Sequence, residues 1–188
     1  MKKRKFIIDT DTASDDAVAI LMALEWPDIQ VMAVTIVSGN MPVDQGSINA
    51  RYTIELCNKN TPVYLGADKP LVKKTAYAKW YHGEDGMGDM FYDSPKQDAL
   101  VDSPIKILYD TFSKYPGEVT LVTLGPLTNI ANLISAFPDV VDKIKEIVIM
   151  GGTACTVGNV TPAAEYNIWC DPEAADIVFK SGVSEITM

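Results

Sequence analysis

Four aspartates stand close together near the start of the chain, directly after an apolar run. They are Asp9, Asp11, Asp15 and Asp16, all within eight residues. Two unit charges about 4 Å apart repel by about 1 kcal/mol in water and by about 4 kcal/mol at an effective dielectric constant of about 20. Such a cluster needs a cation or shared protons in order to close. We therefore interpret it as a candidate divalent-metal site.

A purely structural explanation covers only part of this cluster. Ser14 can cap the helix that is expected to follow, and acidic residues in a first helical turn are stabilised by the helix dipole by about 0.3–1 kcal/mol each. This accounts for Asp15 and Asp16. Asp9 and Asp11 lie where a strand is expected to end, so they have no helix to cap.

The elements that must position these side chains alternate between strand and helix. Apolar and β-branched runs predict strands at residues 5–8, 29–37, 63–65, 118–124, 146–150 and 185–188. Helical spacing and capping signals predict helices at residues 15–25, 43–57 and 104–115. A turn at residues 125–129 leads into a further helix that ends near residue 137, and a last helix is predicted from residue 171 to about residue 181. We expect one α/β domain over residues 1–188, an open and mostly parallel sheet with flanking helices.

The regular pattern is interrupted between residues 66 and 101 by glycines, lysines, aspartates and aromatics. Long loops inside a compact domain are often lids or binding loops, so we predict a mobile loop region here, within which short helices can form. His82, the only histidine of the chain, lies near its centre. The sequence leaves it equally compatible with a ligand contact and with an exposed bystander.

Polar residues follow several of the predicted strands. The ligand of an open parallel sheet lies outside the carboxyl ends of its strands. Those ends carry Asp9 and Asp11, Asn40, Leu124 with Gly125, and Met150 leading to Asn159, Glu165 and Asn167. One crevice lined by carboxylates and carboxamides would suit Ca²⁺ or Mg²⁺ and the hydroxyls of a sugar. Asn40 and Gly125 are also compatible with ordinary turns.

Composition excludes several classes of partner. The net charge of −9 argues against nucleic acid and against an anionic membrane surface. The basic run Lys2–Lys5 precedes only three apolar residues, too few for a signal peptide, and no apolar stretch could span a bilayer. We therefore expect a cytoplasmic protein. Its three cysteines lack CxxC spacing and are expected to be free thiols.

The motifs together resemble a known family. Asp9-Thr-Asp-Thr-Ala-Ser-Asp-Asp16 resembles the DxDxxxDD signature of the inosine-uridine-preferring nucleoside hydrolases. The resemblance continues, in order, through Val37-Ser-Gly-Asn40, His82-Gly83, Leu124-Gly-Pro-Leu-Thr-Asn-Ile130, Met150-Gly-Gly152 and Glu165-Tyr-Asn-Ile-Trp-Cys-Asp-Pro-Glu-Ala174. Each motif alone is weak, whereas the ordered combination is specific. It implies the Rossmann-like fold of that family.

The resemblance also implies a function and a set of roles. The protein would be a Ca²⁺-dependent N-ribohydrolase that splits ribonucleosides into ribose and free base, and it would form a dimer or tetramer. Asp11 would hold calcium and act as general base on the attacking water. Asp16 and the backbone carbonyl of Leu124 would be further calcium ligands, with Asp9 in support. Substrate binding would fall to Asp15, Asn40, His82, Met150, Asn159, Glu165 and Asn167.

The resemblance has one gap. The family's domain continues beyond the position of Met188 and carries there a His-Asp pair, a leaving-group acid and a calcium ligand, which this sequence lacks. Thr12-Ala13 also replaces the more usual Pro-Gly. We expect a C-terminally incomplete domain, either a fragment or a naturally shortened relative. The fragment is favoured because the sheet would otherwise end on an exposed apolar edge. Weak calcium affinity, little hydrolysis and a tendency to aggregate are predicted.

Two other functions compete with hydrolysis of nucleosides. One is a nucleoside- or calcium-binding relative without catalysis. The other is a haloacid-dehalogenase-type phosphatase, because Ile8-Asp-Thr-Asp11 and Gly88-Asp-Met-Phe-Tyr-Asp93 resemble its two acidic motifs. The second motif of that family follows a hydrophobic strand, whereas Gly88 follows a polar, glycine-rich loop. The phosphatase is therefore the weaker alternative.

Overall fold

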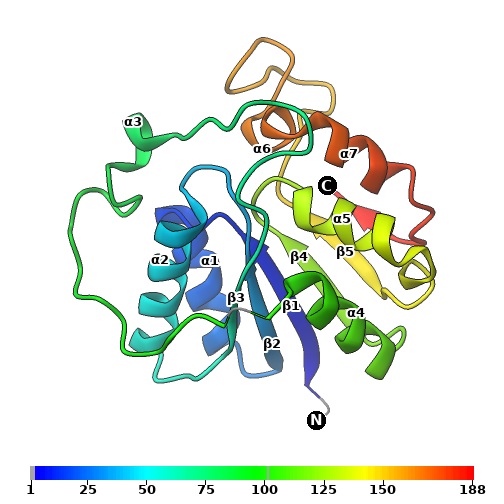
Figure 1. Cartoon of the computed structure of the whole chain (residues 1–188), viewed down its shortest axis with the longest axis horizontal. Coiled ribbons are helices and arrows are strands. Elements are labelled where there is room, and N and C mark those ends of the chain that lie inside the picture. Colours follow the sequence, from blue (N-terminus) through cyan, green and yellow to red (C-terminus); the bar gives the residue numbers. More distant parts are fainter. Residues whose placement is uncertain (1–2, 101) are drawn as a thin grey trace.

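A six-stranded parallel sheet forms the centre of the molecule (Figure 1). The computed structural model describes residues 3–100 and 102–188. Lys2 of the basic run and Val101 at the end of the predicted loop lie outside the described residues. The strands are β1 Arg4–Thr10, β2 Ile29–Ile36, β3 Val63–Leu65, β4 Val119–Thr123, β5 Glu146–Ile149 and β6 Ile186–Thr187. All pairings are parallel, which confirms the predicted open parallel sheet.

Helices cover both faces of the sheet. They are α1 Ser14–Glu25, α2 Val43–Leu56, α3 Lys79–His82, α4 Pro104–Lys114, α5 Thr128–Ala136, α6 Tyr166–Cys170 and α7 Pro172–Phe179, with a 3₁₀ turn at Pro138–Val140. One apolar core joins the sheet to α4, α5 and α7, and a second joins it to α1 and α2. Successive residues of β1 point into opposite cores, Ile7 into the first and Ile8 into the second. Burial on both faces explains why this strand is an apolar run rather than an alternating one.

The strand order is β3-β2-β1-β4-β5-β6. The chain moves outward from β1 to β3 and then returns to place β4 on the other side of β1. The carboxyl ends of β1 and β4 therefore form the point at which the strand order reverses, where parallel sheets open a crevice for ligands. Asp9 is the second-last residue of β1, and Leu124 directly follows β4.

Three local expectations need correction. Strand β1 runs on through Asp9 and Thr10, because both continue the ladder with β2, whereas the sequence predicted its end at Ile8. The expectation that Ser14 caps α1 is wrong: Ala13 is the N-cap residue, and its N–H donates to Asp16 Oδ2 at 3.1 Å. Helix α6 lies in a segment where no helix was predicted, because its five residues are too short for a periodic signal.

The first part of the predicted loop region crosses the carboxyl edge of the sheet on its way to α3 (Figure 1). Main-chain N–H groups fasten it there: Ala67 donates to Asn129 Oδ1 at 2.8 Å and Leu71 donates to Asp171 Oδ2 at 2.9 Å. At the far end, Leu100 N–H donates to the Val63 carbonyl at 2.8 Å, which gives the edge strand β3 a partner. The mobility of the region stays a prediction.

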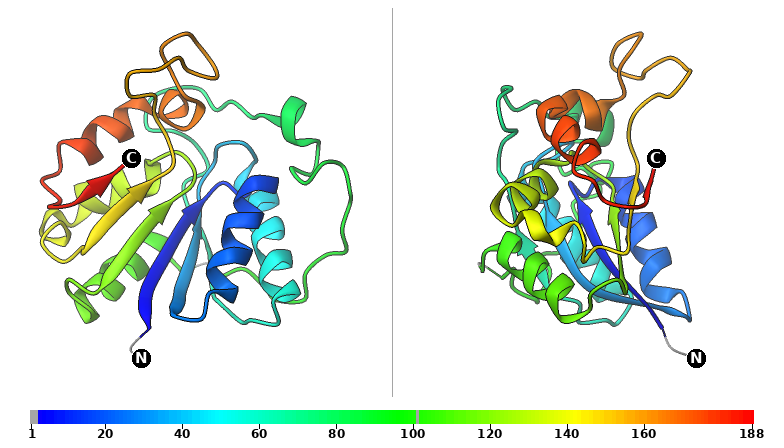
Figure 2. Two further views of the ribbon diagram at one scale, coloured as in Figure 1. Left: turned by 180° about the vertical axis from the view of Figure 1, so that it is seen from behind. Right: turned by 90° about the vertical axis from the view of Figure 1, so that its right-hand side faces the viewer.

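One part of the sheet is left open. Seen from behind (Figure 2, left), no helix of the described residues lies in front of β4 and β5 beside α1. A cleft of about 220 Å³ runs along this side, lined only by apolar residues: Phe6, Ile8, Ala19, Met22, Ala23, Trp26, Ile29, Val122 and Leu124. Within the part of the chain that the structure describes, no helix has the length and hydrophobicity needed to cross a membrane.

Candidate functional site

Three of the four clustered aspartates are buried at the carboxyl end of β1. Asp9 and Asp11 have no solvent exposure and Asp16 has almost none, whereas the Asp15 side chain is 67% exposed. The strand carries Asp9 and Asp11 to the end of the sheet, and the first turn of α1 brings Asp16 back toward them. Within the cluster, Asp15 is the one that faces outward.

Asp11 is enclosed by two tight turns. Its Oδ2 accepts the main-chain N–H of Asn40, which follows β2. A methyl group at Gly39 would lie 2.8 Å from Asp11 Cγ and closer still to Oδ2, and one at Gly125 would lie 2.8 Å from Oδ1. Contacts below 3.0 Å are too short for any Cβ, so both turns need glycine in order to admit this carboxylate.

Asp9 is held by side chains from two other elements. Thr35 of β2 and Asn129 of α5 both donate to its Oδ1, the latter at 2.8 Å. Asn129 Nδ2 also donates to the Ile36 carbonyl at 3.0 Å. In register across the three central strands, Thr35 and Thr123 flank Asp9 on either side. The supporting role that the family resemblance implies for Asp9 stays a prediction.

Burial makes the ionised forms of these carboxyls unfavourable. Desolvation raises the pKa of Asp9 to about 7, against hydrogen bonds from Thr35 and Asn129 that lower it. Desolvation likewise raises the pKa of Asp11 to about 6, against the hydrogen bond from the Asn40 N–H. The pKa of Asp16 is raised well above its ordinary value, first by burial and then by the negative charge of Asp11. Burial therefore favours the protonated forms of these carboxyls, and a bound cation would favour the ionised forms.

Unpaired polar atoms concentrate at this end of the sheet. Among the described residues, the buried side-chain oxygens and nitrogens without a hydrogen-bond partner are six in number, and four of them lie at the carboxyl ends of β1, β2 and β4. These four are Asp9 Oδ2, Asp11 Oδ1, Ser38 Oγ and Thr123 Oγ1. Because buried polar groups are nearly always paired, such a concentration marks a place for bound water, an ion or a ligand.

The donor atoms here suit a hard cation. All are oxygens, and Asp11 Oδ1 is both buried and unpartnered, which is what a calcium ligand would show before the ion binds. No group of three or more His, Cys, Asp or Glu side chains in the described chain is arranged to hold a metal ion. The calcium ligands expected from the sequence are two carboxylates and one main-chain carbonyl. All three donate oxygen, as calcium prefers, although they are few in number.

A cavity of about 280 Å³ opens above the buried carboxylates. It is lined by Asp15, Asn40, Ala78, Trp80, Tyr81, His82, Leu124, Met150, Asn159, Val160, Glu165, Tyr166 and Asn167. All seven residues predicted to bind substrate are among them, together with Leu124. They come from the first turn of α1, from the loops after β2, β4 and β5, and from α3 and α6, so segments far apart in sequence meet at one place.

Residues after β5 form a connected hydrogen-bond system on one wall. Glu165 is the N-cap of α6, and its carboxylate accepts the N–H groups of Asn167 at 2.9 Å and Gly152 at 2.8 Å. Asn167 Nδ2 donates to the Leu124 carbonyl at 2.8 Å and to the Met150 carbonyl at 3.1 Å. A carbonyl has two lone pairs, so this bond leaves Leu124 able to contact a cation as well. Glu165 and Asn167 therefore have structural roles besides any contact with substrate.

The remaining predicted contacts lie on the rim of the cavity. Asn159 is exposed, and its Oδ1 accepts the Tyr166 N–H at 2.8 Å. His82 is the last residue of α3, and its Nδ1 lies 3.3 Å from Ser14 Oγ and 4.0 Å from Asp15 Oδ1. The imidazole is thus not a free bystander, because it contacts the first turn of α1.

Several residues at the site were not singled out by their sequence. Thr35 is an ordinary β-branched strand residue, and Asn129 and Gly39 stood only inside longer motifs. Asp171 was expected to open a helix, and the structure adds that its buried carboxylate accepts Thr128 Oγ1–H at 2.6 Å, the Leu71 N–H and the Ala174 N–H. Contacts across such sequence distances leave no local signal.

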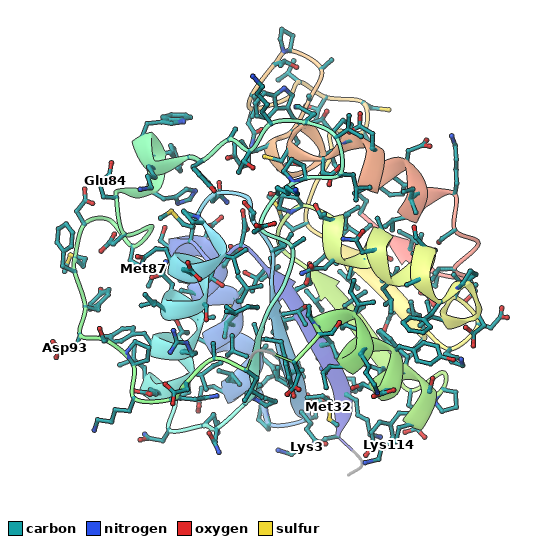
Figure 3. All side chains as sticks on the ribbon, in the orientation of Figure 1. Lys3, Met32, Glu84, Met87, Asp93 and Lys114 are labelled. Carbon is teal, nitrogen blue, oxygen red and sulfur yellow. The ribbon has the colours of Figure 1, made fainter. Side chains whose placement is uncertain are left out.

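The second motif of the phosphatase alternative lies elsewhere. Asp93 lines a different cavity, between α2 and the loop that passes it, together with Gln45 and Tyr52. Figure 3 labels Asp93 at the outer margin of the molecule, away from the strand ends. Asp89 Oδ1 accepts the Glu84 N–H at 2.6 Å within the same loop. These aspartates are therefore not placed to act with Asp9 and Asp11.

Comparison with known proteins gives a consistent set of matches. The model of the family described as inosine-uridine preferring nucleoside hydrolase matches residues 6–188. The pyrimidine-specific ribonucleoside hydrolase RihB of Escherichia coli K12 is 42% identical over 188 residues, which make up all of this chain and 60% of that protein. The chain thus spans about 60% of the length of the curated relatives that it matches.

Solved structures agree with these matches. A plant nucleoside hydrolase, PpNRh1, superposes with a TM-score of 0.94 at 37% identity, over 98% of this chain and 59% of its own. A purine-preferring ribonucleoside hydrolase from Gardnerella vaginalis gives a TM-score of 0.93 at 34% identity, over 97% of this chain and 60% of its own.

Proposed function

This chain belongs to the inosine-uridine preferring nucleoside hydrolase family, and we propose that its strand-end cavity binds a ribonucleoside and hydrolyses the N-glycosidic bond to ribose and free base. The sequence resemblance to the family, and with it the Rossmann-like fold, is confirmed. The names of the E. coli and Gardnerella relatives state opposite base preferences, so the proposal concerns ribonucleosides as a class.

One observation carries the proposal. Asp11 is fully buried and does not itself line the cavity, but its Oδ2 is held by the N–H of the lining residue Asn40, and its Oδ1 is left without a partner. A general base must be fixed in place and yet have a free lone pair for the proton that it takes. Burial also raises the pKa of Asp11 to about 6, close to the range in which a base works best near neutral pH.

In the proposed reaction, the negatively charged side chains around the cavity act on the attacking water and on the ribose. As the oxygen of water bonds to the ribose C1′, Asp11 Oδ1 takes the water proton, the C–N bond breaks and its electron pair leaves with the base. Positive charge develops on the ribose in the transition state. The carboxylates of Asp15 and Glu165, both in the cavity lining, would stabilise that charge, and Asn40 and Asn167 would orient the sugar hydroxyls.

Calcium is part of this proposal. Asp11, Asp16 and the Leu124 carbonyl would hold the ion, with Asp9 supporting Asp11. Bound Ca²⁺ would lower the pKa of the attacking water. Calcium takes about six to eight oxygen ligands, more than these residues provide. We therefore expect weak calcium affinity and slow turnover for the 188-residue chain.

The test compares the wild-type chain with Asp11→Asn, which keeps the shape of the side chain and removes its basicity. Purified protein is incubated with inosine or uridine, in Ca²⁺ or in a chelator, and free base is measured by chromatography. We expect slow, calcium-dependent release that falls by about 10²-fold or more in Asp11→Asn. The exposed Asp44→Asn, in the first turn of α2, serves as the matched control and should keep the wild-type rate.

The non-catalytic alternative has its own signature in the same experiment. A chain that only binds would show heat of ribonucleoside binding by calorimetry and no release of base above the chelator control. Equal rates in wild-type and Asp11→Asn would refute the assignment of the general base. The cytoplasmic location and the dimeric or tetrameric assembly expected from the sequence stay predictions.

A further inference from the structure

Ser14 and His82 join two elements that are far apart in the chain. Ser14 is the first residue of α1, next to the acidic cluster, and His82 ends α3 in the long loop region. The Ser14 hydroxyl lies 3.3 Å from His82 Nδ1, within hydrogen-bond distance. The nearest carboxylate oxygen to that nitrogen, Asp15 Oδ1, lies farther away at 4.0 Å.

The imidazole is the most buried of the three aromatic rings of α3. The His82 side chain is 9% exposed, whereas its neighbours Trp80 and Tyr81 are 82% and 73% exposed. His82 lines the site cavity together with Asp15. Its ring meets Tyr81 edge-on, with the ring centres 4.9 Å apart. All three residues line the cavity, but the His82 ring is the one that is largely withdrawn from solvent.

The main chain on both sides of His82 is also tied down. The His82 N–H donates to the Ala78 carbonyl at 3.1 Å, and the Ala78 N–H donates to the Asn40 carbonyl at 3.0 Å. The His82 carbonyl accepts the Gly88 N–H at 2.8 Å. These bonds hold the backbone, and the Ser14 hydroxyl is the hydrogen-bond partner of the ring itself.

From this geometry we propose that Ser14 is a positioning residue, whose hydroxyl donates to His82 Nδ1 and thereby leaves the Nε2–H to face a ligand in the cavity. The proposal rests on the proposed function for the identity of that ligand, a ribonucleoside with hydrogen-bond acceptors on its base or sugar. A neutral imidazole carries its proton on one nitrogen only, so an occupied lone pair on Nδ1 places the proton on Nε2. Nε2–H would then act as a hydrogen-bond donor to the substrate.

The first test reads the tautomer directly in the protein without ligand. His82 is the only histidine in the chain, so ¹⁵N-labelled protein gives a single imidazole signal set. In alkaline solution, at a pH of about 9, we expect one Nε2–H tautomer in wild-type protein. Ser14→Ala should give a mixture of tautomers, and Ser14→Thr, which keeps the hydroxyl, should restore the single form.

The second test measures binding of uridine and inosine by calorimetry in the presence of Ca²⁺. Loss of one orienting hydrogen bond should weaken binding by about 2- to 10-fold in Ser14→Ala. In a His82→Ala background, Ser14→Ala should have no further effect, because its partner is gone. Ser113→Ala, which removes an exposed serine hydroxyl from α4, is the matched control and should leave both readouts unchanged.

The outcomes separate this inference from the proposed function. An Nδ1–H tautomer in wild-type protein, or identical tautomers and affinities in wild-type and Ser14→Ala, would overturn the role of Ser14. If no variant binds a nucleoside and the tautomer still responds to Ser14→Ala, the failure lies with the proposed function, and the Ser14–His82 pair stands.

Discussion

At the scale of single residues, the site depends on how closely the backbone approaches one carboxylate. Gly39 and Gly125 lie against the two oxygens of Asp11, where no Cβ can fit. Asn40 N–H reaches Oδ2 because the turn at Gly39 runs directly past it. The glycines therefore set the position of Asp11 as much as its own strand does.

Gly39→Ala should for this reason damage the site more than the fold. The added methyl group must displace the Asp11 carboxylate, whose buried position on the N–H of Asn40 is then lost. We expect at least about a 10-fold loss of calcium affinity, measured by calorimetry. Gly151→Ala is the comparison variant, because its methyl group would come no closer than 3.3 Å to any atom, and Glu165 Oε2 would need to move by only a few tenths of an ångström. Equal affinities in the two variants would contradict this account.

The buried carboxyls also predict how stability depends on pH. Burial raises the pKa of Asp9 to about 7 and that of Asp11 to about 6, whereas unfolded aspartates titrate near about 3.9. Between about pH 4 and pH 7 the folded chain thus holds protons that the unfolded chain has released. Stability must then fall as the pH rises through this window.

Thermal unfolding in a chelator should show that fall between about pH 5 and pH 7. Calcium added at about pH 7 should raise the midpoint again, because an ion that binds only the folded state stabilises it. Asp9→Asn removes one titrating group and should flatten the decline, whereas the exposed Asp44→Asn should not. An unchanged slope in Asp9→Asn would show that Asp9 titrates normally.

At the scale of elements, Asp171 joins three parts of the molecule. It is the N-cap of α7 through the Ala174 N–H, and the same carboxylate binds Thr128 at the start of α5 and Leu71 in the loop that crosses the sheet edge. A helix cap is thus also the anchor for the segment that leads to α3 and the cavity.

Asp171→Asn should therefore destabilise the fold by about 1–3 kcal/mol, because the amide cannot accept as many of these buried donors. Urea unfolding measures the effect. Asp110→Asn, which removes only an exposed i,i+4 ion pair with Lys106 on α4, should change stability by less than about 0.5 kcal/mol. A similarly small change in Asp171→Asn would mean that the crossing segment is held by its other contacts.

At the scale of the whole molecule, the sheet is covered unevenly. Beside α1, the cleft lined by nine apolar residues is bordered by Met22 and Trp26, which are 55% and 52% exposed. Leu124 lines both this cleft and the site cavity, so the two surfaces meet at one residue. An exposed apolar surface of this kind promotes association.

We expect the chain to self-associate as its concentration rises, and Met22→Glu to reduce that association by placing a charge at the cleft. Sedimentation velocity over a range of protein concentrations measures it. Val72→Glu, at an exposed apolar residue of the loop that crosses the sheet edge, is the control and should associate like wild-type protein. A monomeric wild-type chain at all concentrations would contradict the prediction.

Much of the fold followed from the sequence because its signals are local. The strand at Val63–Leu65 was predicted to the residue, and the expected alternation of strands and helices is the observed one. Apolar runs, proline at the first turn of α4 and the Asp171 cap act over a few neighbouring residues. The end of β1, the start of α1 and the short α6 were exceptions. At α1, Asp16 rather than Ser14 satisfies the first N–H, and five residues give α6 no period to detect.

The sequence by itself indicated the residues of the candidate site, and their roles stay predictions. Parallel strands bring the ends that carry many of them together whatever the order of the strands along the chain. Only the tertiary structure decided how those residues are held. Asp11 lies between Gly39 and Gly125, Asp9 between Thr35 and Asn129, and His82 against Ser14. Each contact joins residues at least 26 positions apart. Such contacts arise from packing of the sheet against its helices, and no local pattern records them.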